Sequence, residues 1–537
     1  MRITHVAVVA AMVLSVAAGC TGSEPESPVI APTEGGSAEG DAPQDTPAEG
    51  EGDNGTREDP AQAAPGPAVT VTRPLLDTEV EIAVHAVEVE EGLAALIVDY
   101  MSTDGSDLGD DISDITFLHM LSATDLHMTG QGLRLIDPEN QEVFPVLGEE
   151  RERAAQVDTP PDVAGYRSSS LHAAPDVEQI DLLIPGLGYV AGIPVTEAAA
   201  SFDEISGELG RDHEAVSYSL QTWYEDFDEA STLEEDGGEI TVSLTSDLLF
   251  DAEEHELGSD AEATLQGVAD EVEVAADGGE VLVVGHTDDR PTEAYDSNQE
   301  LSELRGAEVG VRLADLLGES FDVVTEGRGD SEPRARNTSE DGRAANRRVE
   351  VHFQGQRVDS AEASQGQGPP EVEGEEASGQ EAVTVEGWDV TPVSVVRRGE
   401  VLVGTFSLAY ATEEEPELLD IQVMNPHPTY RGGHATRRGY FSNSLVELGT
   451  TQVTLLGFGE RIFPLAYEVS ADGVEESEDA VLDVVTRLLG EERLTPGVEE
   501  PGHSRLITVL WPDRGQDSVT IDVPGQFRLS DVTVETE

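Results

Sequence analysis

The stretch 285–305 reads GHTDDRPTEAYDSNQELSELR and places opposite charges on the two sides of one loop. The residues just before it, EVLVVG at 280–285, are almost all apolar, a pattern typical of a β-strand covered by helices. Ser297 and Glu300 have the spacing of a capping box, so a helix is predicted to begin near Asn298. Asp288 therefore follows a strand, and Arg305 lies on the next helix. The two residues could form a structural ion pair or bind one ligand between them.

Strand and helix patterns alternate around this loop, between residues 238 and 354. Strands are predicted at 239–244 (EITVSL), 322–329 (DVVTEGRG) and 348–353 (RVEVHF), and a short helix at 339–347. The helix after residue 298 has an apolar stripe that consists of Leu301, Leu304, Ala307, Val311, Ala314 and Leu317. The order βαβαβ, with a final helix and strand, predicts a mixed α/β sandwich with its helices on one face of the sheet.

Three separated motifs in this region resemble the OmpA-like peptidoglycan-binding domain of OmpA, Pal and MotB proteins. They are GHTD at 285–288, N-x-x-L-S-x-x-R at 298–305 and G-R-x-x-N-R-R-V at 342–349. LLFDAEEHEL at 248–257 is similar to the first loop of that family. The resemblance implies non-covalent binding of diaminopimelate in the peptidoglycan stem peptide, without cleavage.

The resemblance assigns the opposite charges of the loop to the two charges of this ligand. Asp288 would accept the ligand's ammonium group and Arg305 would bind its carboxylate. Guanidinium matches a planar carboxylate with two parallel hydrogen bonds, so the chemistry suits a zwitterion. The implied peptidoglycan-binding residues are Asp288, Arg305, Thr287, Asn298 and Arg347. Neither charge needs to act as a general base, so we expect no enzymatic activity, and we expect no cofactor.

The loop departs from the family pattern at two places. Pro291 stands where the family usually has glycine, and Asp296 and Ser297 are additional residues, so the loop should be longer and stiffer. Asn298 could instead act only as a helix cap. His286 is expected to pack or hydrogen-bond at the strand end rather than bind a metal, because no partner ligands lie nearby.

Arginines are concentrated near the end of this region. They are Arg328, Arg334, Arg336, Arg343, Arg347 and Arg348. A local positive patch would suit an anionic wall polymer. The alternative for Arg343, Arg347 and Arg348 is surface charge or salt bridges, and we favour it for Arg348.

Both flanks of the α/β region are rich in short β-branched runs. LRLIDPENQEVFPVL from residue 133 matches VTLLGFGERIFPLAY from residue 453, with one residue fewer in the second turn, and IPGLGYVAGIPV from 184 matches VPGQFRLSDVTV from 523 without a gap. The sequence predicts two copies of one all-β, immunoglobulin-like sandwich at 68–200 and 382–537. Two unrelated β domains are the alternative. The connector, 201–237, is predicted to contain short helical or irregular pieces.

The first residues predict export. A short basic start and an apolar run end in AAGC, which resembles a lipobox with Cys20 as the lipid-attachment site. An ordinary signal peptide with a chance cysteine is the alternative. Residues 21–67 form an acidic segment rich in Gly and Pro, which predicts a disordered tether, and 355–381 is predicted to be a second disordered linker.

Composition limits the partners of the chain. The 537 residues carry 111 acidic and 29 basic side chains, a formal net charge of -82, and every basic residue is arginine. Such a charge argues against nucleic acid as a partner. One cysteine permits no intrachain disulfide. The acidic stretch 104–114 does not have the spacing of a calcium-binding EF-hand loop, and we expect no metal site.

Together these patterns predict a lipid-anchored envelope protein that connects a membrane to peptidoglycan. The membrane would be the outer membrane or the outer face of the cytoplasmic membrane. The alternative is an adhesion or assembly protein that acts through its β-sandwiches toward another envelope protein, with wall binding only localising it. An envelope hydrolase would need a nucleophile with a base, or a zinc motif, and the sequence contains neither pattern.

Overall fold

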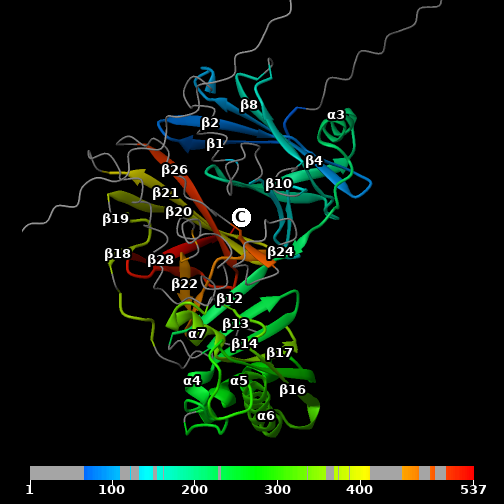
Figure 1. The fold of residues 1–537 in the computed structure, drawn as a ribbon. Helices are drawn as coiled ribbons and strands as arrows, with labels where there is room; N and C mark the ends of the chain where they lie inside the picture. Colours follow the sequence, from blue (N-terminus) through cyan, green and yellow to red (C-terminus); the bar gives the residue numbers. More distant parts are fainter. Residues whose placement is uncertain are drawn as a thin grey trace, which may run out of the picture. The chain divides into compact units, whose positions relative to one another are not determined.

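The structure is a computed structural model, and it describes most of the chain after residue 65. The described residues are 66–108, 121, 132–148, 154–160, 163–227, 231–259, 261–334, 337–357, 368–372, 374–385, 387–411, 450, 452–470, 484–489 and 503–536. The predicted signal segment, Cys20 and nearly all of the predicted tether lie outside these residues, as does Arg336. The described part is mostly β-sheet with few helices (Figure 1).

The first β domain has two sheets with a shared apolar core between them. One sheet contains β1, β2, β4, β8 and β7, and the other contains β10, β9, β5, β6 and β11, while β3 pairs with both β4 and β10. The strands are β1 (Val69–Leu75), β2 (Thr78–Val84), β3 (Val87–Glu90), β4 (Leu93–Ser102), β5 (Arg134–Asp137), β6 (Glu142–Pro145), β7 (Ala155–Asp158), β8 (Gly165–Ala173), β9 (Gln179–Ile184), β10 (Gly188–Glu197) and β11 (Tyr218–Ser219). Helix α3 (Ala200–Leu209) follows β10 and packs against β8, β4 and β3.

The second β domain follows the α/β region in sequence. Its strands are β18 (Glu375–Ser378), β19 (Val383–Val385), β20 (Trp388–Arg398), β21 (Val401–Tyr410), β22 (Thr454–Gly457), β23 (Glu460–Ile462), β24 (Ala466–Ser470), β25 (Val484–Leu488), β26 (Ser504–Pro512), β27 (Ser518–Val523) and β28 (Phe527–Thr536). Trp388 and Trp511 are the largest side chains of its buried core. Part of the stretch predicted to be a disordered linker is ordered, because β18 pairs in parallel with β28.

The two β domains share strand order and register. Leu135 pairs with Leu182 in the first domain, and Leu455 pairs with Ile521 at the matching place in the second. The parallel pairs Val87–Val195 and Val395–Val534 also correspond. Even the register shift near Val190 recurs near Leu529. This is the arrangement that two copies of one domain would have.

The α/β domain lies between the two β domains in sequence. Its elements are β13 (Ser231–Asp236), β14 (Glu239–Thr245), α4 (Ser246–Leu249), α5 (Ala261–Ala275), β15 (Gly279–His286), α6 (Asn298–Leu317), the 3-10 turn η1 (Gly318–Ser320), β16 (Phe321–Gly329), α7 (Glu340–Asn346) and β17 (Arg348–Gln354). The strand order is β13-β14-β17-β15-β16, with only β15 and β16 parallel. Helices α5 and α6 contact each other, and α6 packs on β15 and β16 (Figure 1).

Glycines bring α6 very close to the sheet. A Cβ atom added to Gly306 would lie 2.6 Å from the carbonyl oxygen of Glu326, and one added to Gly310 would lie 2.2 Å from the Thr325 methyl group. The buried face of α6 therefore differs from the predicted stripe. Val311 is 65% exposed, and Gly306 and Gly310 are buried instead.

The connector 201–237 was predicted to be helical or irregular, and the structure corrects its second half. Residues 200–209 are helical, but β12 (Gln221–Asp226) and β13 form an antiparallel hairpin. β13 joins the sheet of the α/β domain and β12 joins β23 of the second β domain. One sheet therefore runs from the α/β domain into the second β domain.

In the described ranges, no helix is both long enough and apolar enough to span a bilayer.

Candidate functional site

The predicted site residues come together at one end of the α/β sheet. His286 is the last residue of β15, and Thr287 and Asp288 follow it directly. Arg305 lies in the second turn of α6, and Arg347 follows α7. The end of β15, which pairs in parallel with β16, therefore lies near the start of α6. The sequence motifs correspond to one place in the fold.

Asp288 is buried and held by a specific pair of donors. Its side chain accepts a hydrogen bond from the Arg290 backbone N–H at 2.9 Å and forms an ion pair with Arg347 at 2.8 Å. Arg347 also binds both carboxylate oxygens of Asp247, at 3.0 and 2.8 Å. The hydrogen bond with Asp247, followed by that with Asp288, raises the pKa of Arg347. Arg347 therefore fixes the direction of the Asp288 carboxylate.

Arg305 is 5% exposed, yet it has little polar compensation. Its Nε donates to the Glu254 carbonyl oxygen at 2.9 Å, and its guanidinium carbon lies 5.0 Å from the centre of the Phe250 ring. Within the described residues Nη1 and Nη2 make no hydrogen bond, and Arg305 forms no ion pair with Asp288. Burial lowers the pKa of Arg305. The structural ion-pair alternative for Asp288 and Arg305 is therefore wrong.

Asn298 organises the loop between the two charges. Its Nδ2 donates to the Asp288 carbonyl oxygen, and its Oδ1 accepts from the Thr292 N–H, both at 3.1 Å. The helix cap is instead Ser297, whose side chain accepts from the Glu300 N–H at 3.1 Å. The alternative that Asn298 acts only as a cap is wrong.

The unusual loop is also fixed to the loop after α4. Glu253 accepts hydrogen bonds from the Thr292 hydroxyl at 2.6 Å and from the Glu293 N–H at 2.9 Å. The hydrogen bond from Thr292 lowers the pKa of Glu253. His255 Nδ1 and the Tyr295 hydroxyl are 2.8 Å apart. Sequence reasoning did not identify Glu253 or His255, and only the similarity of the 248–257 segment to the family's first loop pointed to this region.

Thr287 and His286 are buried beside Asp288. The Thr287 hydroxyl has no hydrogen-bond partner within the described residues, although its N–H donates to the Gly329 carbonyl oxygen at 2.8 Å. His286 is 1% exposed, and its Nε2 lies 3.3 Å from a Glu350 oxygen without hydrogen-bond geometry. Burial lowers the pKa of His286. In the described ranges no three His, Cys, Asp or Glu side chains form a group that could hold a metal.

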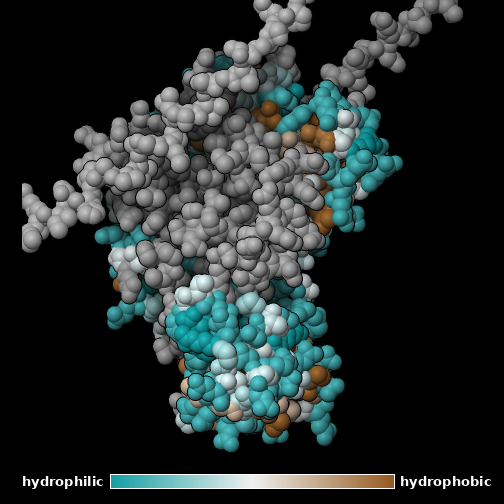
Figure 2. Space-filling model, in the orientation of Figure 1, coloured by the Kyte–Doolittle hydropathy of each residue, from teal (hydrophilic) through white to brown (hydrophobic). Residues whose placement is uncertain are grey.

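The predicted arginine patch is neutralised by carboxylates. Each described arginine of the cluster has an acidic partner: Arg328 with Glu326 and Glu332, Arg334 with Glu234, Arg343 with Glu340, Arg347 with Asp247 and Asp288, and Arg348 with Glu350. For Arg348 we favoured a salt bridge, and the structure shows one, with Glu350. The part of the α/β surface visible in Figure 2 is mainly hydrophilic. The prediction of an unpaired positive patch is therefore wrong.

The arrangement offers three polar groups to a ligand. Arg305 offers an anion its two NH2 groups, Nη1 and Nη2, which make no hydrogen bond within the described residues. Thr287 offers a hydroxyl without a partner there, and Asp288 offers a fixed carboxylate to a cation. A ligand with a carboxylate and an ammonium group close together would use all three.

Comparisons with known proteins point to the same region. A model of the OmpA family matches residues 249–347. Outer membrane protein A of Bordetella avium is 37% identical over 116 residues, which are 22% of this chain and 58% of that protein. The matched part of this chain thus spans little more than half of that relative's length.

Two solved structures are similar over about the same share of the chain. The structure of the cell wall anchor of the T6SS from Pseudomonas aeruginosa is 34% identical, with 24% of this chain and 90% of that chain covered and a TM-score of 0.23. The periplasmic domain of Helicobacter pylori MotB is 26% identical, with 24% and 83% covered and a TM-score of 0.22. The family match itself lies within the α/β domain.

Proposed function

Because residues 249–347 are an OmpA family domain, we propose that this chain binds peptidoglycan non-covalently in the cell envelope. The proposed ligand is the diaminopimelate of the stem peptide, and residues 238–354 are the proposed binding domain. The name of the relative, outer membrane protein A, supports an envelope location. We propose no enzymatic activity.

The main support for this proposal is the buried guanidinium of Arg305, which has few polar partners. A guanidinium that is 5% exposed and makes one hydrogen bond through Nε is incompletely compensated. Burying an unpaired charge is unfavourable, and an incoming carboxylate would relieve that penalty by binding Nη1 and Nη2. The lowered pKa of Arg305 has the same cause, which is burial. An anion of the ligand therefore belongs at this position.

Asp288 would take the ligand's ammonium group, with Thr287 beside it. Asp288 shares its carboxylate with Arg347, so the ammonium would join an existing ion pair rather than replace it. A carboxylate has about four acceptor positions, and the Arg290 N–H and Arg347 use two of them. Asn298 and Arg347 are then positioning residues for Asp288.

The rest of the chain would anchor and present this domain. We propose that lipid on Cys20 attaches the protein to a membrane, with residues 21–67 as the tether. The membrane would be the outer membrane or the outer face of the cytoplasmic membrane. Replacement of Cys20 by serine should release the full-length protein from the membrane fraction; retention there would refute the lipid anchor.

We also propose that the β domains are immunoglobulin-like. The order β2-β4-β8-β7 follows the ABED sheet of that fold, and β10-β9-β5-β6 follows its GFC sheet with an added edge strand. Domains of this kind present surfaces to other proteins. The second proposed function is therefore adhesion or assembly through the β domains, with wall binding for localisation.

The test of peptidoglycan binding is co-sedimentation of the full-length protein with purified sacculi. We expect Arg305→Ala to weaken binding about tenfold to hundredfold, because a hydrogen bond to a charged group contributes about 1.5–3 kcal/mol. Arg312→Ala is the matched control, since Arg312 lies on the same helix and pairs with Glu262. Free diaminopimelate should compete. Equal sedimentation of wild type and Arg305→Ala would refute the assignment.

A further inference from the structure

The two β domains have one pair of equivalent outer faces with different occupants. Leu93 of β4 pairs with Ala173 of β8, and Val401 of β21 pairs with Pro512 of β26. The loops that follow β8 and β26 have the same length, so these pairs correspond. The β4–β8 face consists of Leu93, Ala95 and Leu171. The β21–β26 face consists of the equivalent residues Val401, Val403 and Leu510.

The β21–β26 face is covered by a sheet of the first β domain. Its residues form one buried cluster with Ile136, Val143 and Leu183 of the first domain, here called the β5–β6–β9 face. Polar contacts surround the cluster: Arg398 pairs with Asp181 at 3.0 Å, and Arg134 Nε donates to the Tyr467 hydroxyl at 3.0 Å. This chain therefore contains a direct example of what such a face binds, namely an apolar three-stranded sheet face.

The equivalent β4–β8 face is covered by helix α3 instead. Phe202 and Ile205 of α3 are 1% and 5% exposed and belong to the same buried cluster as the β4–β8 face. Glu88 shows on which side the helix lies. It pairs with Ala95 across the sheet, so both side chains point outward, and its carboxylate accepts hydrogen bonds from the Ala199 and Phe202 N–H groups at 3.0 and 2.9 Å.

We propose that the β4–β8 face is a docking surface for an apolar β-sheet face, and that α3 is the internal occupant that keeps it closed. The contact between the two β domains is head-to-tail, because different faces meet. A head-to-tail contact can continue from one domain to the next unless something ends it. Helix α3 fills the position where the next β domain would sit. The proposal adds a partner chemistry for the β domains and does not depend on peptidoglycan binding.

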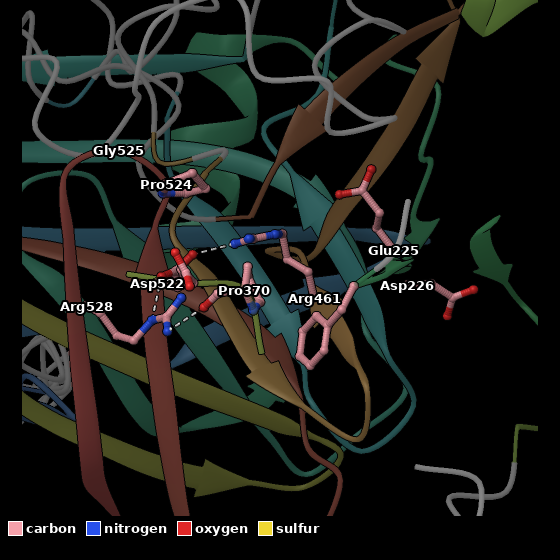
Figure 3. A pocket seen from close by; sticks show the side chains of 10 residues that line it. Glu225, Asp226, Pro370, Arg461, Asp522, Pro524, Gly525 and Arg528 are labelled. Atoms are coloured by element: carbon pink, nitrogen blue, oxygen red, sulfur yellow. Dashed lines mark hydrogen bonds and ion pairs between the residues drawn. The ribbon is translucent and has the colours of Figure 1, made fainter. Parts of the chain in front are cut away.

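Within its described residues, the second β domain has no apolar face equivalent to the β5–β6–β9 face, so it cannot be the partner. The positions that correspond to Val143 and Leu183 carry Arg461 and Asp522. Arg461 and Arg528 both point at Asp522, with hydrogen bonds of 2.6 and 2.8 Å (Figure 3). They line a polar pocket of about 260 Å³ together with Pro370, whose carbonyl oxygen accepts from Arg528. The partner that we propose is therefore the β5–β6–β9 face of a second copy of this chain.

The test mixes two full-length variants. The donor chain carries Val403→Asp and Arg398→Ala, which should release its β5–β6–β9 face by placing a charge in the shared cluster and removing the pair with Asp181. The acceptor chain carries Phe202→Asp and Ile205→Asp, which should lift α3 from the β4–β8 face. Size-exclusion chromatography with light scattering should show a one-to-one donor–acceptor complex, while donor and wild type remain separate.

Control variants test separately whether the β4–β8 face is a docking surface and whether α3 closes it. Glu204→Ala, at an exposed position of α3, should behave as wild type does toward the donor. Equal complex formation of the donor with wild type and with the acceptor would show that α3 does not close the face. Absence of any complex, with cooperative unfolding intact in both chains, would overturn the docking surface. A second donor with Leu510→Asp in place of Val403→Asp guards against misfolding of the first.

Discussion

Asn298 and Ser297 are neighbours, but substitution of the first should affect ligand binding and substitution of the second should affect stability. Asn298 joins the Asp288 carbonyl to the Thr292 N–H, whereas Ser297 caps α6. We expect Asn298→Ala to weaken sacculus binding several-fold, because the loop that carries Asp288 loses two hydrogen bonds. Ser297→Ala should lower the free energy of unfolding by about 1 kcal/mol, the usual effect of losing a cap, and leave binding nearly unchanged.

The two variants are each other's control. Sacculus co-sedimentation measures the first effect, and urea unfolding measures the second. Loss of binding in Ser297→Ala with none in Asn298→Ala would mean that the cap, rather than the loop bridge, holds the site in place.

At the residue scale the sequence placed Asp288 and Arg305 correctly on the two sides of a loop. Local signals suffice for this, because a strand end and a capping box lie within the same stretch. The partner of Asp288 could not be deduced in the same way. Arg347 is 59 positions away, and its orientation depends on Asp247 in α4. The pairing of Arg334 with Glu234 of β13 is likewise distant in sequence. By contrast, Arg328, Arg343 and Arg348 pair with carboxylates within four residues, which the sequence alone could have indicated.

At the element scale the packing of α6 on the sheet predicts opposite results for two glycines in helices. Gly306→Ala should destabilise the protein, although alanine is the better helix former by about 1 kcal/mol. The new Cβ would lie 2.6 Å from the Glu326 carbonyl oxygen, so helix and sheet would have to separate. Gly267→Ala on α5 meets nothing within 4 Å and should stabilise by up to about 1 kcal/mol.

Urea unfolding of the two variants measures whether each substitution raises or lowers the free energy of unfolding. A gain in the free energy of unfolding for Gly306→Ala comparable to that for Gly267→Ala would show that the close helix–sheet contact is unimportant.

The same contact explains why the predicted apolar stripe of α6 was only partly right. Leu301 and Leu317 are buried as expected, but Val311 is exposed. Hydrophobic periodicity counts large apolar side chains and treats glycine as neutral. Here the side of α6 that faces β15 and β16 carries glycines, because the helix backbone lies too close to the sheet to leave room for side chains. The strand β12 was missed for a related reason: its tertiary partner β23 lies far along the chain.

At the scale of the whole molecule, an ionic joint connects the α/β domain to the second β domain. Arg357, just after β17, lies 3.4 Å from Glu271 of α5 and 2.8 Å from Glu460 of β23. Its guanidinium carbon is 4.1 Å from the centre of the Tyr224 ring in β12. Burial raises the pKa of Glu271 to about 7. The continuous sheet through β12 and β13 and this joint make the two domains one structural unit.

The raised pKa makes Glu271 a source of pH-dependent stability. Between about pH 4.3, where a free glutamate titrates, and pH 7, the folded protein keeps a proton that the unfolded chain loses. The contribution of Glu271 to stability therefore falls as pH rises through this window, by at most about 4 kcal/mol. Glu271→Gln should gain stability relative to wild type as pH increases from 4.5 to 7.

The control for this prediction is Glu273→Gln, an exposed position of the same helix. Denaturant unfolding across the pH range gives the difference between each variant and wild type. A difference for Glu271→Gln that is constant with pH would show that Glu271 does not titrate in this window.

The net charge of -82 sets the salt dependence of wall binding. Stem peptides carry carboxylates, so the approach of this acidic chain to a sacculus is opposed by repulsion that salt screens over about 10 Å at 0.1 M. We expect sacculus binding to strengthen as salt rises from about 0.02 to 0.15 M. Free diaminopimelate has no net charge at neutral pH, and we propose that it binds through short-range contacts with Arg305 and Asp288. Its affinity should therefore change little with salt. Titrations of both ligands at matched salt concentrations separate the two contributions. Sacculus binding that weakens with salt more steeply than diaminopimelate binding would mean that a local attraction outweighs the charge of the whole chain.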